Sequence, residues 1–108
     1  MIARGVILSP AAERDLNDIY RWVASGAGPG TALAYVSRIE RYLLKLDLGS
    51  ERGTTRNDVR SGLRIVGFER SLTIAFTVTE ADVTILRIFR RGRNWTRKAL
   101  PRDPPQSS

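Results

Sequence analysis

A cluster of arginines directly after an apolar run is the feature of this sequence most suited to binding chemistry. Arg90, Arg91 and Arg93 follow residues 83–89, and Arg87 interrupts that run. A guanidinium keeps its charge at physiological pH and presents five N–H donors in one plane, which suits paired hydrogen bonds to carboxylates and phosphates. The sequence therefore predicts that a core strand carries a cationic binding surface at its end.

The whole chain carries excess positive charge. Its 108 residues include 18 lysines and arginines against 11 aspartates and glutamates, which gives a formal net charge of +7, and all but two of the basic residues are arginines. Such a charge predicts an anionic partner. The alternative is that the charge only keeps a small protein in solution.

Several kinds of chemistry are excluded by what the chain lacks. It has no cysteine and no histidine, which removes thiol nucleophiles, sulfur-ligated zinc and the usual general base at neutral pH. Its carboxylates are scattered, so we expect no metal and no cofactor. The apolar run near the N-terminus is too short for a signal peptide, and no stretch approaches the roughly 20 apolar residues of a membrane span. We therefore expect a cytoplasmic protein with no membrane partner.

Two amphipathic helices are predicted after a short strand at residues 6–8. Ser9 is a good helix N-cap and Pro10 suits the first helical position. A breaker cluster at residues 25–30 predicts a loop, and we expect the second helix to be capped by Thr31. The apolar positions recur at helical spacing at Ala12, Leu16, Ile19, Tyr20 and Val23, and then at Ala32, Tyr35, Val36, Ile39, Tyr42, Leu43 and Leu46. The short connection predicts an antiparallel hairpin.

The first helix has a polar side and one ambiguous aromatic residue. Arg14, Asp15, Asp18 and Arg21 lie away from the apolar stripe, so we expect them at the surface. Trp22 lies off the centre of the stripe. We expect it to broaden the core face, with a role as a partly exposed contact residue as the alternative.

Three strands are predicted in the second half, at residues 63–68, 72–78 and 83–89. The second alternates strictly between apolar and polar or small residues, which is typical of a half-buried strand. Residues 49–62 are polar and predict a loop. The strands should form an antiparallel meander with one apolar face, packed on the helical hairpin as a two-layer α+β domain. We expect this domain to span residues 1–100, and the proline-containing tail 101–108 to be disordered.

In this order of elements the chain resembles the ParE branch of the RelE/ParE toxins of bacterial toxin–antitoxin pairs. The matching stretches are residues 8–16, 34–39, 51–53, 62–65 and 83–88. The resemblance implies a RelE/ParE-like fold and a toxin neutralised by a ParD-like antitoxin. The antitoxin, and not the toxin, would contact operator DNA.

The resemblance also implies one of two targets. RelE-like relatives cut mRNA on the ribosome and commonly use a tyrosine or histidine near the C-terminal strand, whereas ParE-like proteins are described as inhibitors of DNA gyrase. This chain has no histidine, and its tyrosines, Tyr20, Tyr35 and Tyr42, all lie on the predicted helices. Arginine is a poor proton shuttle. We therefore expect a non-enzymatic gyrase inhibitor. An mRNA-cleaving toxin and a non-toxic antitoxin-binding module remain as alternatives.

Two sets of site residues follow from the predicted positions. The expected target-binding residues are Arg64, Arg87, Arg90, Arg91, Arg93 and Trp95. The expected antitoxin-binding residues are Trp22, Tyr35, Arg38 and Arg70. We expect Arg64 and Arg87 to lie close together on the sheet. The alternative for this pair is a structural role, with Glu69, Asp82 or the antitoxin as the partner.

Overall fold

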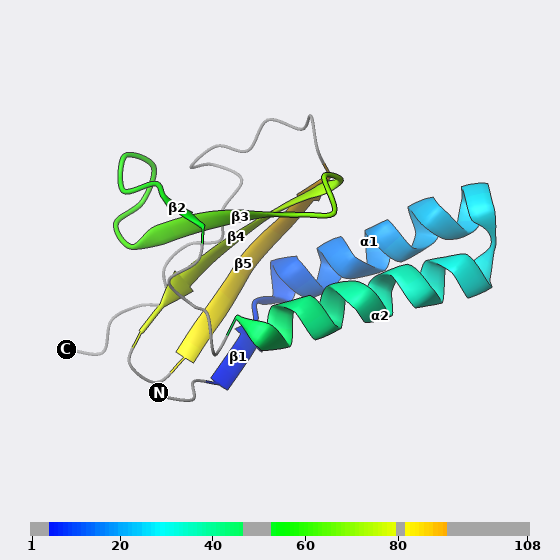
Figure 1. Cartoon of the computed structure of the whole chain (residues 1–108), viewed down its shortest axis with the longest axis horizontal. Helices are drawn as coiled ribbons and strands as arrows, with labels where there is room; N and C mark the ends of the chain where they lie inside the picture. The colour runs from blue at the N-terminus through cyan, green and yellow to red at the C-terminus, as the bar shows by residue number, and fades with distance from the viewer. Residues whose placement is uncertain (1–4, 47–52, 80–81, 91–108) are drawn as a thin grey trace.

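The computed structural model describes residues 5–46, 53–79 and 82–90. Two helices lie against one face of a sheet, as the sequence predicts for a two-layer α+β domain (Figure 1). The elements in chain order are β1 (Gly5–Leu8), α1 (Pro10–Ala27), α2 (Pro29–Lys45), β2 (Thr54–Thr55), β3 (Leu63–Phe68), β4 (Leu72–Val78) and β5 (Asp82–Arg90). The predicted tail lies outside the described residues.

Ser9 caps α1 and also fastens it to the sheet. Its Oγ accepts a hydrogen bond from the Ala12 N–H at 3.0 Å, which confirms the predicted N-cap. The same hydroxyl donates to the Leu86 carbonyl oxygen at 2.8 Å, and the Ser9 N–H donates to the Ile85 carbonyl at 2.9 Å. The start of α1 is therefore fixed beside β5.

The connection between the helices is shorter than the sequence suggested. α1 runs to Ala27, and α2 begins at Pro29, so the expected loop at 25–30 and the expected cap at Thr31 are wrong. Gly28 alone makes the turn, with φ 90° and its N–H bonded to the Ala24 carbonyl at 2.9 Å. Glycine adopts this φ readily, and proline needs no N–H partner at the first helical position. The antiparallel helical hairpin is confirmed (Figure 1).

The sheet has five strands in the order β1-β5-β4-β3-β2. Strands β3, β4 and β5 form the predicted antiparallel meander. β1 pairs in parallel with the first half of β5, ending where Leu8 lies opposite Ile85. Beyond that point no described strand pairs with this edge of β5, and the helix α1 runs along it instead. A register shift between Ala75 and Phe76 leaves Leu86 as an extra residue on β5, a β-bulge that bends the strand.

The expected loop at 49–62 contains a short strand that the sequence did not predict. Thr54 and Thr55 form β2 and pair with Ile65 and Arg64. Gly53 precedes them with φ 86°. Polar, exposed residues that pair along an edge carry no apolar alternation, so periodicity gave no signal for this strand.

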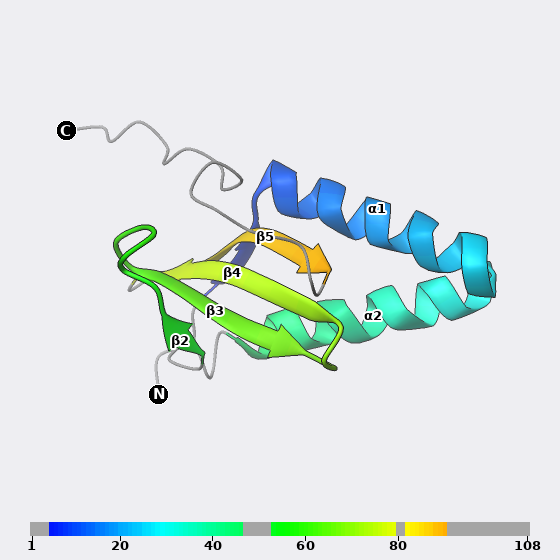
Figure 2. The same ribbon diagram turned by 90° about the horizontal axis from the view of Figure 1, so that it is seen from above.

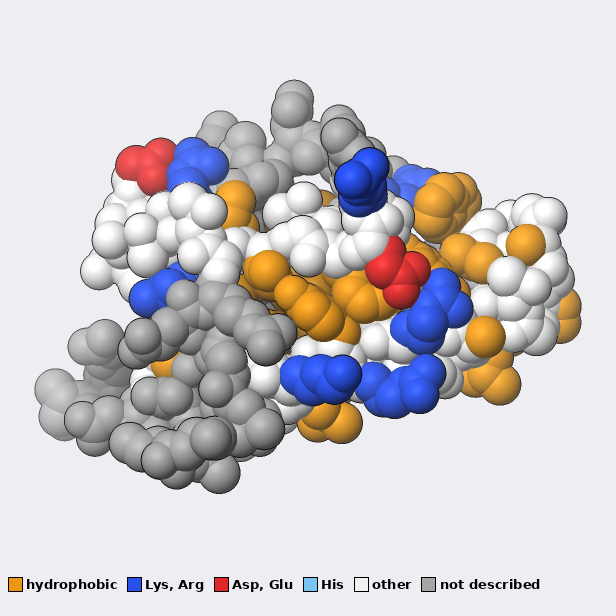
Figure 3. Space-filling model, in the orientation of Figure 1, with side chains coloured by type: hydrophobic (Ala, Val, Ile, Leu, Met, Phe, Trp, Pro, Cys, Tyr) orange, Lys and Arg blue, Asp and Glu red, His pale blue; other side chains and the backbone are white. Residues whose placement is uncertain are grey.

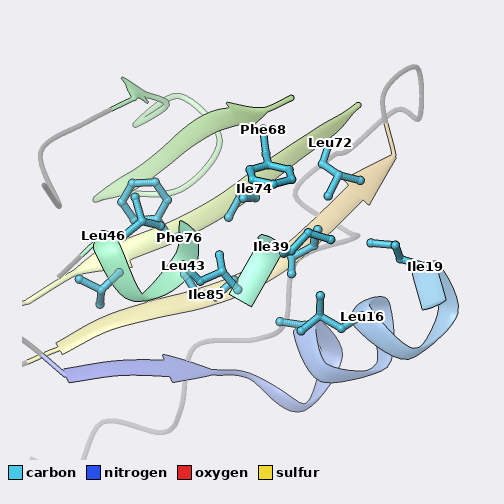
Figure 4. Packing of buried hydrophobic residues seen from close by; sticks show 13 residues of the cluster. Leu16, Ile19, Ile39, Leu43, Leu46, Phe68, Leu72, Ile74, Phe76 and Ile85 are labelled. Carbon is cyan, nitrogen blue, oxygen red and sulfur yellow. The ribbon is translucent and has the colours of Figure 1, made fainter. Parts of the chain in front are cut away.

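The main core lies between the helices and the sheet. Figure 4 shows apolar side chains of both helices meeting those of β3, β4 and β5. A second, smaller cluster on the opposite face contains Leu63, Ala75, Leu86 and Phe89. The sheet thus has apolar side chains on both faces, where one apolar face was expected. In the described parts of the chain, neither helix is both long enough and apolar enough to cross a membrane.

Candidate functional site

Arg87 finds its partner on α1. Its Nε and Nη2 donate to the two carboxylate oxygens of Asp15 at 2.7 and 2.9 Å. These hydrogen bonds raise the pKa of Arg87, although partial burial opposes the effect. The pairing differs from the Glu69 and Asp82 partners that the sequence suggested. Because the charge of Arg87 is compensated within the domain, its first role is structural.

Asp15 was missed as a site residue and was wrongly expected at the surface. The residue is only 9% exposed, and its Oδ2 also accepts the Ile88 N–H at 2.8 Å. It therefore occupies the place of a strand partner along β5 beyond the end of β1. The only available signal was indirect, since an arginine within an apolar strand requires an acidic neighbour. Nothing in the sequence indicated which carboxylate would supply it.

Trp22 is exposed, so its expected place in the core is wrong. The residue is 48% exposed, and the guanidinium of Arg90 lies 4.7 Å from the centre of its ring. A cation over the face of an indole is an attractive arrangement. The contact joins one residue from each predicted surface, because Trp22 was assigned to the antitoxin and Arg90 to the target.

The side chains of Asp15, Trp22, Arg87 and Arg90 line one groove between α1 and the end of β5. The hollow has a volume of about 230 Å³. Its lining residues are Asp15, Asp18, Ile19, Trp22, Arg87, Ile88, Phe89 and Arg90. In this groove the charges of Asp15 and Arg87 compensate each other, and the guanidinium of Arg90 stacks on Trp22. We refer to it as the α1–β5 groove.

The β3–β4 turn gathers three of the four predicted antitoxin-binding residues. Arg38 of α2 donates to both carboxylate oxygens of Glu69 at 3.0 and 3.2 Å, and its guanidinium lies 5.3 Å from the Tyr35 ring centre. The hydrogen bonds lower the pKa of Glu69. Arg70 is exposed at the turn and, like Glu69, has a positive φ, at 58° and 47°. Such values are unfavourable for residues with side chains.

The tyrosines of α2 are occupied by structural contacts. The Tyr35 hydroxyl lies 2.6 Å from Ser71 Oγ. The Ser71 hydroxyl also lies 3.3 Å from the Phe68 carbonyl oxygen, to which it can donate. Tyr42 packs on Phe68 with ring centres 5.1 Å apart. Both rings therefore join α2 to the turn end of β3.

Arg64 and Arg87 are not brought together. They lie on β3 and β5, which β4 separates, and Arg64 lies opposite Phe76 while Arg87 lies opposite Ala75. Arg87 turns toward α1 to reach Asp15. The remaining predicted target-binding residues, Arg91, Arg93 and Trp95, lie outside the described residues.

The surface around α2 combines apolar and basic groups. Figure 3 shows hydrophobic side chains exposed between the sheet and α2, with lysine and arginine side chains beside them. Seen from above, the turn end of β3 and β4 lies over α2, and the end of β5 lies closer to α1 (Figure 2). Within the described ranges, no three acidic side chains gather in a way that could hold a metal ion.

Comparisons with known proteins agree with this architecture. Residues 6–95 match the family model described as the ParE toxin of the type II toxin–antitoxin system parDE. A chain in a solved structure titled as the chromosomal ParDE TA system from P. aeruginosa superposes with a TM-score of 0.72 at 27% sequence identity, covering 83% of this chain and 98% of that chain. No curated protein matches. The family match spans most of the chain, and the protein therefore belongs to the ParE toxin family of type II toxin–antitoxin systems.

Proposed function

We propose that this ParE-type toxin acts by binding DNA gyrase and not by catalysis, and that a ParD-like antitoxin neutralises it in the cytoplasm. The supporting observation is the end of β5. There Arg90 lies over the ring of the exposed Trp22, and the sequence adds Arg91 and Arg93 directly beyond. Arginine and tryptophan are frequent energetic centres of protein interfaces.

The side chains near this end favour binding over acid–base catalysis. The chain has no histidine. Tyr35 and Tyr42 lie on α2 and contact the β3–β4 hairpin, and Tyr20 lies on α1. A ribonuclease needs groups that take and give protons at the scissile phosphate, and arginine does so poorly because its pKa is far above neutrality. A stoichiometric inhibitor needs only a complementary surface.

The two target classes are separated by one pair of assays. We expect the purified protein to inhibit gyrase supercoiling of relaxed plasmid in proportion to toxin bound, and to leave ribosome-bound mRNA intact. Relaxation by a type I topoisomerase serves as the control and should be unaffected. Cleavage of the mRNA with normal supercoiling would replace the proposal with an RelE-type activity. Absence of both effects would favour a non-toxic binding module.

The antitoxin surface is proposed to include Trp22, Tyr35, Arg38 and Arg70. Tyr35 and Arg38 are already ordered by Ser71 and Glu69, which lowers the entropy cost of binding. We expect alanine at each of the four positions to weaken binding of the cognate antitoxin about tenfold, as is common for interface residues worth more than 1 kcal/mol. Unchanged affinity in all four variants would refute this assignment.

A further inference from the structure

A glycine inside β3 has no cause among its described neighbours. Gly67 lies near the end of the strand, and its φ is not in the left-handed region that favours glycine. A Cβ built at Gly67 would have the Leu72 carbonyl oxygen, at 3.8 Å, as its nearest described neighbour, which is an ordinary contact. Glycine weakens a strand, and inside one it often marks a place where another group approaches closely. Gly67 therefore points to a contact with a group beyond its described neighbours.

Gly67 opens a hollow on the sheet face that carries the smaller apolar cluster. The hollow has a volume of about 370 Å³ and is lined by Gly67, Arg70, Leu72 and Thr73. Gly67 pairs with Thr73, and Thr73 pairs with Phe89 of the smaller cluster. Because paired residues of neighbouring strands share a face, these three residues form one row across the sheet. The hollow therefore lies on the side of the sheet away from the helices, at the end of that row.

The lining of the hollow suits a flat aromatic side chain with one polar group. Its floor is the backbone at Gly67, Thr73 adds a hydroxyl, and Arg70 adds a guanidinium at the turn. An indole on this floor would bury apolar area, donate its N–H to the hydroxyl and lie near a cation, which its ring attracts. A carboxylate or phosphate would use only the cation and leave the glycine floor uncovered. Tryptophan is the residue type that uses all three features.

The chain itself delivers a tryptophan to this part of the sheet. β5 ends at Arg90, which pairs with Leu72 in the lining of the hollow. The first aromatic residue after Arg90 is Trp95. Five residues of extended chain span up to about 17 Å, whereas Gly67 lies two strands away from β5, about 10 Å across the sheet. Trp95 can therefore reach the hollow, and Gly92 between them favours the turn that this return needs.

We propose that the hollow over Gly67 is the docking site of Trp95, which closes a short loop that begins at Arg90. Arg91 and Arg93 are then presented on a loop anchored at both ends, which lowers the conformational entropy lost when they bind a partner. Trp95 thus serves the target surface indirectly, where a direct contact was expected. The inference goes beyond the proposed function and holds whatever these arginines bind.

The test follows Trp95 by fluorescence in a Trp22→Phe protein, in which it is the one remaining tryptophan. A capped peptide of residues 91–99 gives the signal of the exposed indole. We expect the protein to emit at shorter wavelength than the peptide, and acrylamide to quench it about threefold less, as for an indole covered by apolar groups. In the wild-type protein, we expect NOESY cross-peaks between the Trp95 ring protons and the Gly67 Hα protons.

Gly67→Leu fills the hollow from its floor. The backbone at Gly67 accepts a side chain, so the strand should remain folded. In the Trp22→Phe background, we expect the emission and quenching of Trp95 to become those of the peptide. Thr77→Leu is the matched control, because Thr77 lies on the same face but pairs with Leu63, at the other end of β3. This control should leave the Trp95 signal unchanged.

Emission and quenching of the Trp22→Phe protein equal to those of the peptide would overturn the proposal. So would a Trp95 signal that Gly67→Leu leaves unchanged, because the indole would then be covered elsewhere. A shift in emission that grows with protein concentration would assign the hollow to a second copy of the chain. If Gly67→Leu fails to fold, the absence of the NOESY cross-peaks in the wild-type protein overturns the proposal.

These measurements need neither gyrase nor antitoxin. A protein that passes them but does not inhibit gyrase would lose the proposed target and keep the docked tryptophan. A protein that inhibits gyrase but fails them would keep the target and lose the loop.

Discussion

Asp15 and Arg87 join the first helix to the last described strand across 72 residues of sequence, through two hydrogen bonds of 2.7 and 2.9 Å. The same carboxylate accepts the Ile88 N–H. The pair therefore replaces a strand partner where β1 has ended and places Arg90 beside Trp22. Its loss should affect both the stability of the domain and the shape of the α1–β5 groove.

Removing Asp15 should destabilise the protein substantially. Asp15→Ala leaves Arg87, whose side chain is 25% exposed, without its carboxylate and leaves the Ile88 N–H without its acceptor. We expect a loss of about 2–3 kcal/mol in the free energy of unfolding, less than for a fully buried pair. Asp15→Asn keeps an acceptor for the N–H and should lose less. Urea denaturation measures both.

Asp18→Ala is the matched control for that experiment. Asp18 is exposed on the same helix, and its contact with Arg21, at 3.5 Å, is long and exposed. Exposed pairs of this kind contribute little, so the unfolding free energy should stay within about 0.5 kcal/mol of wild type. An Asp15→Ala protein as stable as Asp18→Ala would show that the Asp15–Arg87 pair does not stabilise the fold.

The sequence predicted the elements whose signals are local. Ser9 and Pro10 marked the start of α1, and the alternation at 72–78 marked β4, because the residues responsible are neighbours along the chain. The helix junction was predicted too long, since several breakers stood together and only Gly28 was needed. Composition alone does not reveal which breaker turns the chain.

The site was less predictable because it depends on distant contacts. The spacing of Asp15 placed it on the polar side of α1, but Asp15 itself is buried against the edge of β5, where it accepts the Ile88 N–H. Trp22 was expected in the core because it adjoins the apolar stripe. The helical hairpin extends beyond the end of the sheet (Figure 1), so residues far along α1 have little of the sheet beneath them. Whether a helix residue has a strand beneath it depends on how the elements pack, which the spacing along the helix does not reveal.

The β3–β4 turn should become more stable when Arg70 is replaced by glycine. Arg70 has φ 58°, which costs a residue with a side chain about 1 kcal/mol or more. Glycine removes that strain but gains freedom in the unfolded chain, so we expect a net stabilisation of about 0.5 kcal/mol. Thermal and urea denaturation would measure it. A less stable Arg70→Gly protein would mean that Arg70 contacts outweigh the strain.

The same variant separates stability from function. If Arg70 contacts the antitoxin as proposed, Arg70→Gly should bind the cognate antitoxin more weakly although it is at least as stable as wild type. Strained residues that persist at the cost of stability are often found at binding sites. Equal antitoxin affinity would remove Arg70 from the proposed surface.

The Arg38–Glu69 pair should make stability depend on pH in the acidic range. The folded-state pKa of Glu69 lies below its ordinary value of 4.5, chiefly because Arg38 donates hydrogen bonds to it. The stabilisation is therefore fully present above pH 4.5 and is lost as the pH falls below that value. Glu69→Gln should be less stable than wild type at pH 7, and the difference should shrink at pH 3.

A double-mutant cycle checks the cause of that effect. In an Arg38→Ala background, Glu69→Gln should change neither the stability nor its dependence on pH, because the partner that lowers the pKa is gone. A pH-dependent difference of undiminished size in that background would assign the effect to another group.

Gly53 should not tolerate a side chain. An added Cβ would lie within van der Waals overlap of the Ile65 carbonyl, and φ is 86°. We expect Gly53→Ala to displace β2 and to cost about 1–2 kcal/mol. Gly26→Ala is the opposite case, because Gly26 lies in α1 with open space around it. We expect this substitution to raise the free energy of unfolding by up to about 1 kcal/mol. Equal effects of both substitutions would contradict the β2–β3 geometry.

The claim that the C-terminal basic end binds gyrase is tested most directly by a charge-matched supercoiling assay. One variant carries alanine at Arg90, Arg91 and Arg93, and leaves Arg87 with Asp15. The control carries alanine at Arg14, Arg41 and Lys45, which are exposed on the helices and remove the same charge. We predict at least tenfold weaker inhibition by the first variant, with both folded, and inhibition near wild type by the control. Equal inhibition by the two variants would contradict the account.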